Sequence, residues 1–189
     1  MIGFLAEKAA DFLVTKNIIE QDEKSVYKYG AEITLSTLLG FALILTVGAF
    51  SNNIIESVMF LLCCVSIRIY SGGYHADTYL QCNLTFISIF AAILLVKAII
   101  PHNIVIYAAA AMSVLSFAII FILSPVENKK KPLTSGEKVK YKKKSIILSV
   151  MWTLAALVLY IMNMQTYSAI PITMFTIAIL MVVEKIIKI

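Results

Sequence analysis

The chain has 189 residues, of which 60% are hydrophobic and 14% charged, with a formal net charge of +5 and a mean hydropathy of +0.90. A water-soluble domain carries about 25% charged residues, so this composition excludes that class. It predicts an all-α, polytopic membrane protein. We expect one membrane domain over residues 1–189, because no long polar linker divides the chain.

Residues 1–30 are too polar to cross a membrane. Apolar residues recur there at helical spacing, with Glu7, Lys8 and Asp11 between them. This pattern predicts an amphipathic helix lying on the membrane surface. We expect no signal peptide, because no basic region precedes an apolar stretch that ends in a cleavage site.

Six apolar segments follow, each of roughly the 17–20 residues that a helix needs to cross the hydrocarbon core. The predicted transmembrane helices cover residues 31–50, 54–70, 84–100, 104–123, 145–164 and 169–185. The links at 51–53, 101–103 and 165–168 are tight, and those at 71–83 and 124–144 are longer.

The basic residues predict the orientation. With six spans, fifteen of the 16 lysines and arginines fall on one side, eight of them in the 124–144 link, and the tight links on the other side contain none. By the positive-inside rule, both termini, residues 1–30 and the 71–83 link face the cytoplasm. The lysines of the 124–144 link set this topology and bind anionic lipid, and they can also attract an acidic partner.

The remaining basic residue, Lys97, lies three residues from the outer end of the third predicted span. Glu56 lies at a similar depth near the outer end of the second. An isolated charge is costly there, so one interpretation is that the two form an ion pair. The other is that Lys97 extends alone to the outer interface.

The 71–83 link contains the strongest candidate for chemistry. His75 precedes Cys82 by seven residues, and a thiol needs a nearby base or another activating environment to act as a nucleophile at neutral pH. Residues seven apart on one straight helix are separated by about 10 Å, too far for a hydrogen bond. Either the backbone bends between them, or His75 meets Cys82 of a second copy. Gly72 and Gly73 predict a flexible backbone just before His75.

Several neighbouring groups could support this pair. Arg68 is either a ligand for a substrate carboxylate or an interfacial anchor, and Ser71 could add a hydrogen bond. The candidates for a third group that orients His75 are Asp77, Gln81 and Asn83. The other histidine, His102, is interpreted as a loop residue, and Cys63 and Cys64 as small buried hydrophobes.

The sequence Arg68, Ser71-Gly72-Gly73-Tyr74-His75-Ala76 and Cys82, in a short polytopic chain with a Lys-rich link, resembles the accessory gene regulator B (AgrB) family. The resemblance extends over nearly the whole length in size, number of spans and position of the basic link. Members are integral membrane cysteine endopeptidases of Gram-positive quorum sensing. They remove the acidic C-terminal tail of an AgrD-type precursor peptide and help the retained part cyclise to a thiolactone or lactone.

The resemblance also implies roles for individual residues. Cys82 matches the nucleophile and His75 the catalytic base, while Arg68 and Gly73 match positions that the family needs for activity. A basic stretch linked to processing corresponds to Lys129, Lys130 and Lys131. The family further implies a homodimer in the cell membrane.

Other classes of protein predict different features. A small peptide or solute transporter could use Glu56 and Lys97 to line a path, but it gives no reason for His75 and Cys82. A structural or sensor subunit needs no chemistry at all. No motif predicts a cofactor, and two histidines without a Cys-x-x-Cys pair make a zinc site an unfavourable interpretation. We expect no nucleic-acid partner.

Overall fold

The computed structural model describes residues 2–73, 78–99, 101–127 and 133–187. Within these ranges the secondary structure is helical, in the order α1 (Ile2–Thr15), α2 (Lys24–Phe50), α3 (Ile54–Ser71), α4 (Tyr79–Ile99), α5 (His102–Leu123), α6 (Ser135–Ile161), η1 (Gln165–Ser168) and α7 (Ala169–Ile187). The six helices α2–α7 are long and apolar enough to cross a membrane. The predicted fold class is therefore confirmed, and the chain is a multi-pass membrane protein.

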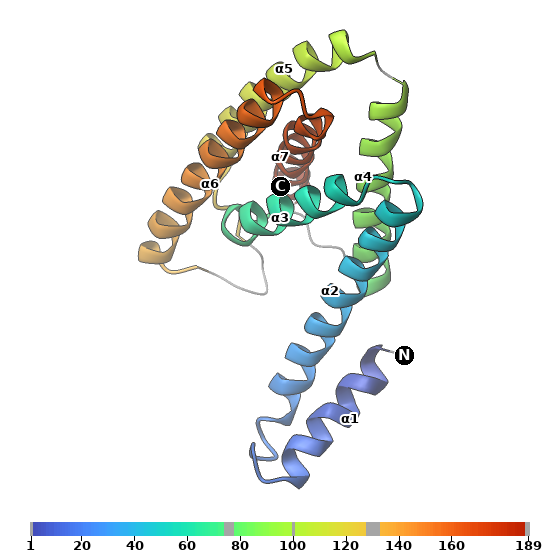
Figure 1. The fold of residues 1–189 in the computed structure, drawn as a ribbon. Coiled ribbons are helices and arrows are strands. Elements are labelled where there is room, and N and C mark those ends of the chain that lie inside the picture. Colours follow the sequence, from blue (N-terminus) through green and yellow to red (C-terminus); the bar gives the residue numbers. More distant parts are fainter. Residues whose placement is uncertain (1, 74–77, 100, 128–132, 188–189) are drawn as a thin grey trace.

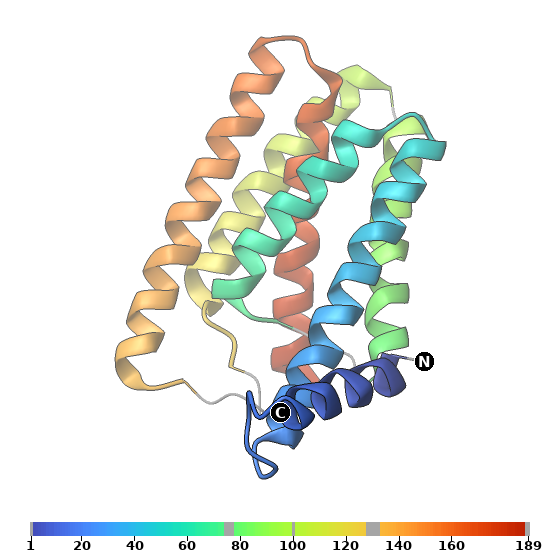
Figure 2. The same ribbon diagram turned by 60° about the horizontal axis from the view of Figure 1, so that its bottom comes forward.

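Helices α3 and α7 form the centre of the bundle (Figures 1 and 2). About 44% and 39% of their spanning windows are buried inside the protein, against 17–22% for the other four spans. The ring of Phe60 on α3 packs against Phe86 and Phe90 of α4, with centroids 5.0 and 5.4 Å apart. Met174 and Met181 of α7 are fully buried in the same core. The poorly buried spans therefore expose apolar surface to lipid.

The chain termini lie at one end of the bundle, where α1 runs outside it along the start of α2 (Figure 2). We call this the basic end; it also holds the end of α3, the start of α4 and the start of α6. Lys24 forms ion pairs of 2.7 Å with both Glu7 and Asp11, and Lys28 also pairs with Glu7. The hydrogen bond from Lys24, followed by that from Lys28, lowers the pKa of Glu7 to about 2. The polar face of α1 thus binds α2.

The apolar side of α1 is exposed, as an interfacial helix requires. Phe4 and Phe12 are 63% and 57% exposed, while the small residues Ala6 and Ala10 are buried. An amphipathic helix with this distribution rests its aromatic side chains in the membrane interface. The predicted N-terminal helix is confirmed.

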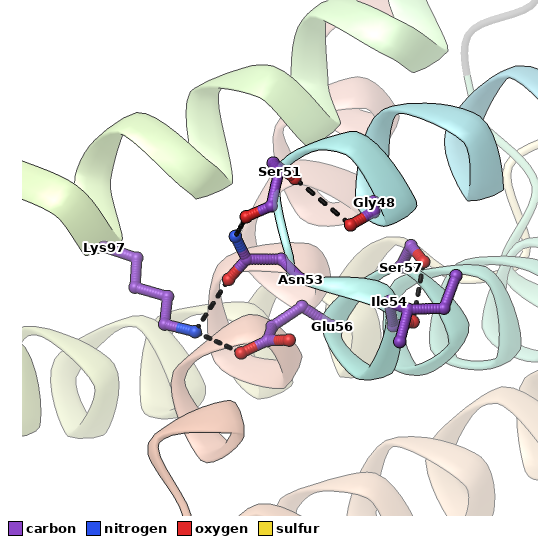
Figure 3. A network of polar contacts seen from close by, with 7 residues as sticks. All are labelled: Gly48, Ser51, Asn53, Ile54, Glu56, Ser57 and Lys97. Atoms are coloured by element: carbon purple, nitrogen blue, oxygen red, sulfur yellow. Dashed lines mark hydrogen bonds and ion pairs between the residues drawn. The ribbon is translucent and has the colours of Figure 1, made fainter.

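At the opposite end of the bundle, the predicted pairing of Glu56 with Lys97 is confirmed. Lys97 Nζ donates to the Glu56 carboxylate and, at 3.0 Å, to Asn53 Oδ1 (Figure 3). Asn53 in turn donates to the Ser51 carbonyl at 2.6 Å, so the network includes the tight 51–53 link. Glu56 is only 7% exposed, and the pair neutralises a charge that would be costly alone.

Three transmembrane helices begin earlier than the apolar runs predict. These are α2 at Lys24, α4 at Tyr79 and α6 at Ser135. At α6 the cause is a capping box, in which the Thr134 hydroxyl accepts from the Glu137 amide and the Glu137 carboxylate accepts from the Thr134 amide. Much of the predicted 124–144 link is therefore helix, which continues the span beyond its apolar part.

Candidate functional site

The sequence predicted that Cys82 lies in the 71–83 link, but it lies in the first turn of α4. The side chain of Thr78 accepts a hydrogen bond from the Gln81 amide at 3.3 Å, and the Cys82 amide donates to the Thr78 carbonyl at 3.0 Å. These contacts start the helix just before the cysteine. Cys82 is half-buried, so its thiol sits on a rigid element and is still accessible.

Arg68 lies in the last turn of α3. Its guanidinium forms a hydrogen bond with the thiol of Cys64, one turn earlier on the same helix. Cys64 itself is buried, as predicted. The structure thus places two of the predicted site residues at helix ends, Arg68 at the end of α3 and Cys82 at the start of α4.

The segment that leads to His75 is held in place, which corrects the prediction of a flexible Gly72–Gly73. Gly72 pairs with Val126, and the Val126 amide donates to the Ser71 carbonyl at 2.8 Å. A Cβ on Gly72 would lie 2.0 Å from the Val126 carbonyl oxygen, and the φ angle of Gly72 is 71°. Glycine is therefore required by close backbone approach and by conformation. Ser71 is fully buried, and its hydroxyl bonds to the Gly72 carbonyl at 3.2 Å.

Gly73 lies against α7. Its φ angle is 128°, and a Cβ there would lie 3.5 Å from Met181 Cγ and 3.6 Å from the carbonyl carbon of Leu180. Glu184 is 8% exposed and lies three residues beyond Met181 on the same face of α7. A buried carboxylate thus lies one turn along α7 from the residue that Gly73 faces. Sequence reasoning missed it, although a lone acid in an apolar span was a signal.

Some predicted site residues take other places. Asn83, a candidate for orienting His75, faces α2 and donates to Ser36 Oγ at 3.3 Å in a buried hydrogen bond. Gln81 is exposed. Residues outside the described ranges are His75, Asp77, Lys129, Lys130 and Lys131.

The start of α6 packs on Tyr70, at the end of α3. Lys144 donates to the Tyr70 hydroxyl at 3.4 Å and lies 4.7 Å from the centre of its ring. The rings of Tyr70 and Tyr141 meet edge to face at 5.5 Å. These contacts attach the lysine-rich turns of α6 to the helix that carries Arg68. Sequence reasoning missed them because it assigned these residues to a link.

The described residues contain no cluster of side chains that could bind a metal ion. No three His, Cys, Asp or Glu side chains there come together as the ligands of a metal ion would. What the described geometry offers is a half-buried thiol at a helix start, an arginine and a glycine turn held by backbone contacts.

Residues 6–183 match the protein family described as Accessory gene regulator B. The chain is 28% identical over 166 residues to a protein of Listeria innocua serovar 6a that is named only for its likeness to AgrB; the match covers 86% of this chain and 80% of that protein. A second protein so named, from Clostridium perfringens strain 13, is 28% identical over 149 residues, or 76% and 70% of the two chains. A third, from Listeria monocytogenes serotype 4a, is 29% identical over 166 residues, or 86% and 80%. No solved structure matches the chain.

Proposed function

The chain belongs to the accessory gene regulator B family, and we propose that it is the membrane cysteine endopeptidase that cleaves an AgrD-type precursor peptide. Membership assigns it a role in quorum-sensing processing that involves such a peptide. The peptidase chemistry, the tail that is removed and the residues that act are our proposal. They follow from the resemblance and from the geometry around Cys82.

The observation that carries the proposal is the position of Cys82. It is half-buried in the first turn of α4, at the basic end, with Arg68 on the neighbouring helix. The first turn of a helix is where backbone dipoles favour negative charge. A thiolate, and the oxyanion that its attack generates, both carry that charge. Cys63 and Cys64 are buried inside α3 and offer no comparable access.

The reaction is acyl transfer. The Cys82 thiolate attacks the carbonyl carbon of the scissile peptide bond, and His75 donates a proton to the departing amine, which releases the C-terminal tail. The retained part is then a thioester on Cys82. An internal thiol or hydroxyl of that part gives its proton to His75 and attacks the thioester carbonyl, which closes the ring and returns Cys82 as a thiolate. A site that excludes water favours ring closure over hydrolysis.

The basic end faces the cytoplasm in this proposal, in agreement with the distribution of lysines. The lysines at the start of α6 then attract the acidic tail of the precursor. The contact of Lys144 with Tyr70 attaches this positive surface to α3, the helix that carries Arg68. The guanidinium of Arg68 suits a carboxylate of the substrate. The family resemblance adds a homodimer, in which His75 serves either its own Cys82 or that of the partner.

A transporter gains no support from the charges that suggested it. Glu56 and Lys97 bind each other and Asn53 at the end opposite Cys82. They form a closed contact between helices and do not line a path.

The test is co-expression with the small AgrD-type open reading frame beside the gene, followed by mass spectrometry of the peptide. Cys82→Ala and His75→Ala are compared with wild type and with Cys63→Ala, a matched thiol control in the core, at equal membrane levels. We expect both site variants to lose the cleaved tail and Cys63→Ala to keep it. Unchanged cleavage in Cys82→Ala would remove the proposed nucleophile.

A further inference from the structure

A groove runs along α4 on the side that faces α7. Its volume is about 560 Å³, within the range of ligand sites. On α4 it is lined at helical spacing by residues from Gln81 to Val96, a rise of about 22 Å. On α7 it is lined by Ile172 and Thr176. The groove therefore extends from the first turn of α4 across most of the span.

The groove begins in the turn of α4 that carries Cys82, although Cys82 itself is not among the residues that line it. Gln81, Leu84 and Thr85, which line it, are the immediate helical neighbours of the cysteine. Ile89 also lines it and lies seven residues after Cys82, on the same face of α4. A molecule in the groove would therefore have one end at the turn that carries the thiol.

The polar groups of the groove are unusual for a membrane-spanning helix. Many hydroxyls elsewhere in the spans bond back to a carbonyl three or four residues earlier, as Ser66 does at 3.1 Å and Thr46 and Thr153 do at 2.7–2.8 Å. The hydroxyls of Thr85 and Ser88 and the side-chain amide of Gln81 make no hydrogen bond within the described part of the chain.

The unpaired hydroxyls of Thr85 and Ser88, within the span, call for a polar occupant. Water is scarce in the hydrocarbon region, and a polar group without a partner there is costly. If the occupant were a transmembrane helix, its backbone N–H and C=O groups would already be hydrogen-bonded within that helix. It would therefore gain little from the hydroxyls in the groove. An extended peptide has free N–H and C=O groups at regular intervals and would gain most.

We propose that this groove binds the segment of the precursor that precedes the scissile bond, in an extended conformation that starts at Cys82. This rests on the proposed function. About seven residues at 3.3 Å each fill the length of the groove. Gln81, Thr85 and Ser88 bind the peptide backbone, while Ile89, Val96 and Ile172 contact apolar side chains. The groove therefore selects a precursor whose residues before the cleavage site are uncharged and apolar.

The first test separates binding from chemistry. Ala92→Phe fills the groove, whereas Ala98→Phe makes the same change on an exposed part of α4 outside it. With the AgrD-type precursor and full-length protein in liposomes, we expect Ala92→Phe to raise KM at least tenfold. The kcat of Ala92→Phe and the alkylation rate of Cys82 by a small thiol reagent stay near wild type, and Ala98→Phe changes neither constant. If wild type is active and Ala92→Phe has an unchanged KM, the proposal that the groove binds the precursor is wrong. The proposed peptidase function would be unaffected by that result.

A second variant tests whether the hydroxyls of Thr85 and Ser88 bind the peptide backbone. Thr85→Val together with Ser88→Ala removes two hydrogen-bonding groups at nearly constant shape, and we expect KM to rise about tenfold. The control is Thr46→Val, whose hydroxyl bonds to its own helix. An equal KM for the double variant and the control would contradict the assignment of backbone binding.

A photo-crosslinker at Ser88 in a Cys82→Ser background identifies the occupant. A crosslink to the residues just before the cleavage site supports the proposal. A crosslink to a second copy of the chain, or to lipid alone, overturns it. If wild type does not cleave the precursor at all, the proposed function fails and the groove assignment fails with it.

Discussion

At the end of the bundle opposite the termini, Lys97 binds Glu56 and Asn53, and Asn53 binds the 51–53 link (Figure 3). At the basic end, Cys82 is half-buried, and farther along α4 the hydroxyls of Thr85 and Ser88 lack partners within the described chain. Polar contacts at the basic end hold its periphery, as the ion pairs of Lys24 hold α1, and the backbone contact of Gly72 with Val126 holds the end of α3. The opposite end thus uses its polar side chains in one closed network. The basic end and the groove that starts there keep a thiol and two hydroxyls without such a network.

The largest expected effect comes from breaking the backbone contact at the basic end. Gly72→Ala places a Cβ 2.0 Å from the Val126 carbonyl oxygen and forces a positive φ on an L-residue. We expect precursor cleavage to fall about 100-fold, equivalent to roughly 2.7 kcal/mol, because the segment before His75 is displaced. Initial rates at matched membrane levels measure this.

The control is Gly136→Ala, because a Cβ on Gly136 meets nothing within 4 Å. That variant keeps the wild-type rate. Wild-type cleavage by Gly72→Ala would show that the contact with Val126 is irrelevant to activity.

Breaking the network at the opposite end should instead lower stability. Lys97→Met leaves Glu56 buried without its cation, and we expect a loss of about 2 kcal/mol, moderated because the Lys97 side chain is 25% exposed. The rate of cleavage per folded molecule stays unchanged. Denaturation in detergent measures the loss, and Lys97→Met with Glu56→Leu should recover most of it. Additive effects of the two changes would mean that the pair is not coupled.

A smaller effect is expected where α4 meets α2. Ser36→Ala removes the buried partner of Asn83, so the free energy of unfolding should fall by about 1 kcal/mol. If Asn83 instead oriented His75 in catalysis, Ser36→Ala would change kcat more than stability. Thermal unfolding and single-turnover rates on the same preparation separate the two.

The smallest effect is the pH dependence of α1. The pKa of Glu7 is lowered to about 2 from 4.5, so its ion pairs contribute fully above pH 4.5 and are lost as the pH falls toward 2. The thermal midpoint of wild type should exceed that of Glu7→Gln at neutral pH, and the two should converge on acidification. A constant difference across this range would exclude Glu7 as the titrating group.

The sequence predicted where the transmembrane helices lie because a helix needs only a sufficiently long apolar run to cross the membrane. It predicted the pairing of Glu56 with Lys97 because the two charges lie at a similar depth in neighbouring spans. It missed the start of α6, since a run of lysines hid the capping box of Thr134 and Glu137. It interpreted Gly72 as flexible because Val126, which holds it, is distant in sequence. Contacts between helices, including the groove along α4, have no signature in a single chain's periodicity.

The most direct test of the account is to detect the acyl-enzyme. Purified protein is mixed with the AgrD-type precursor, quenched in acid and analysed by intact mass spectrometry, with Cys82→Ala in parallel. The account predicts a protein heavier by the retained part of the precursor, with the added mass on Cys82 and released by hydroxylamine. Tail release at the wild-type rate from Cys82→Ala, with no adduct in either protein, would contradict it.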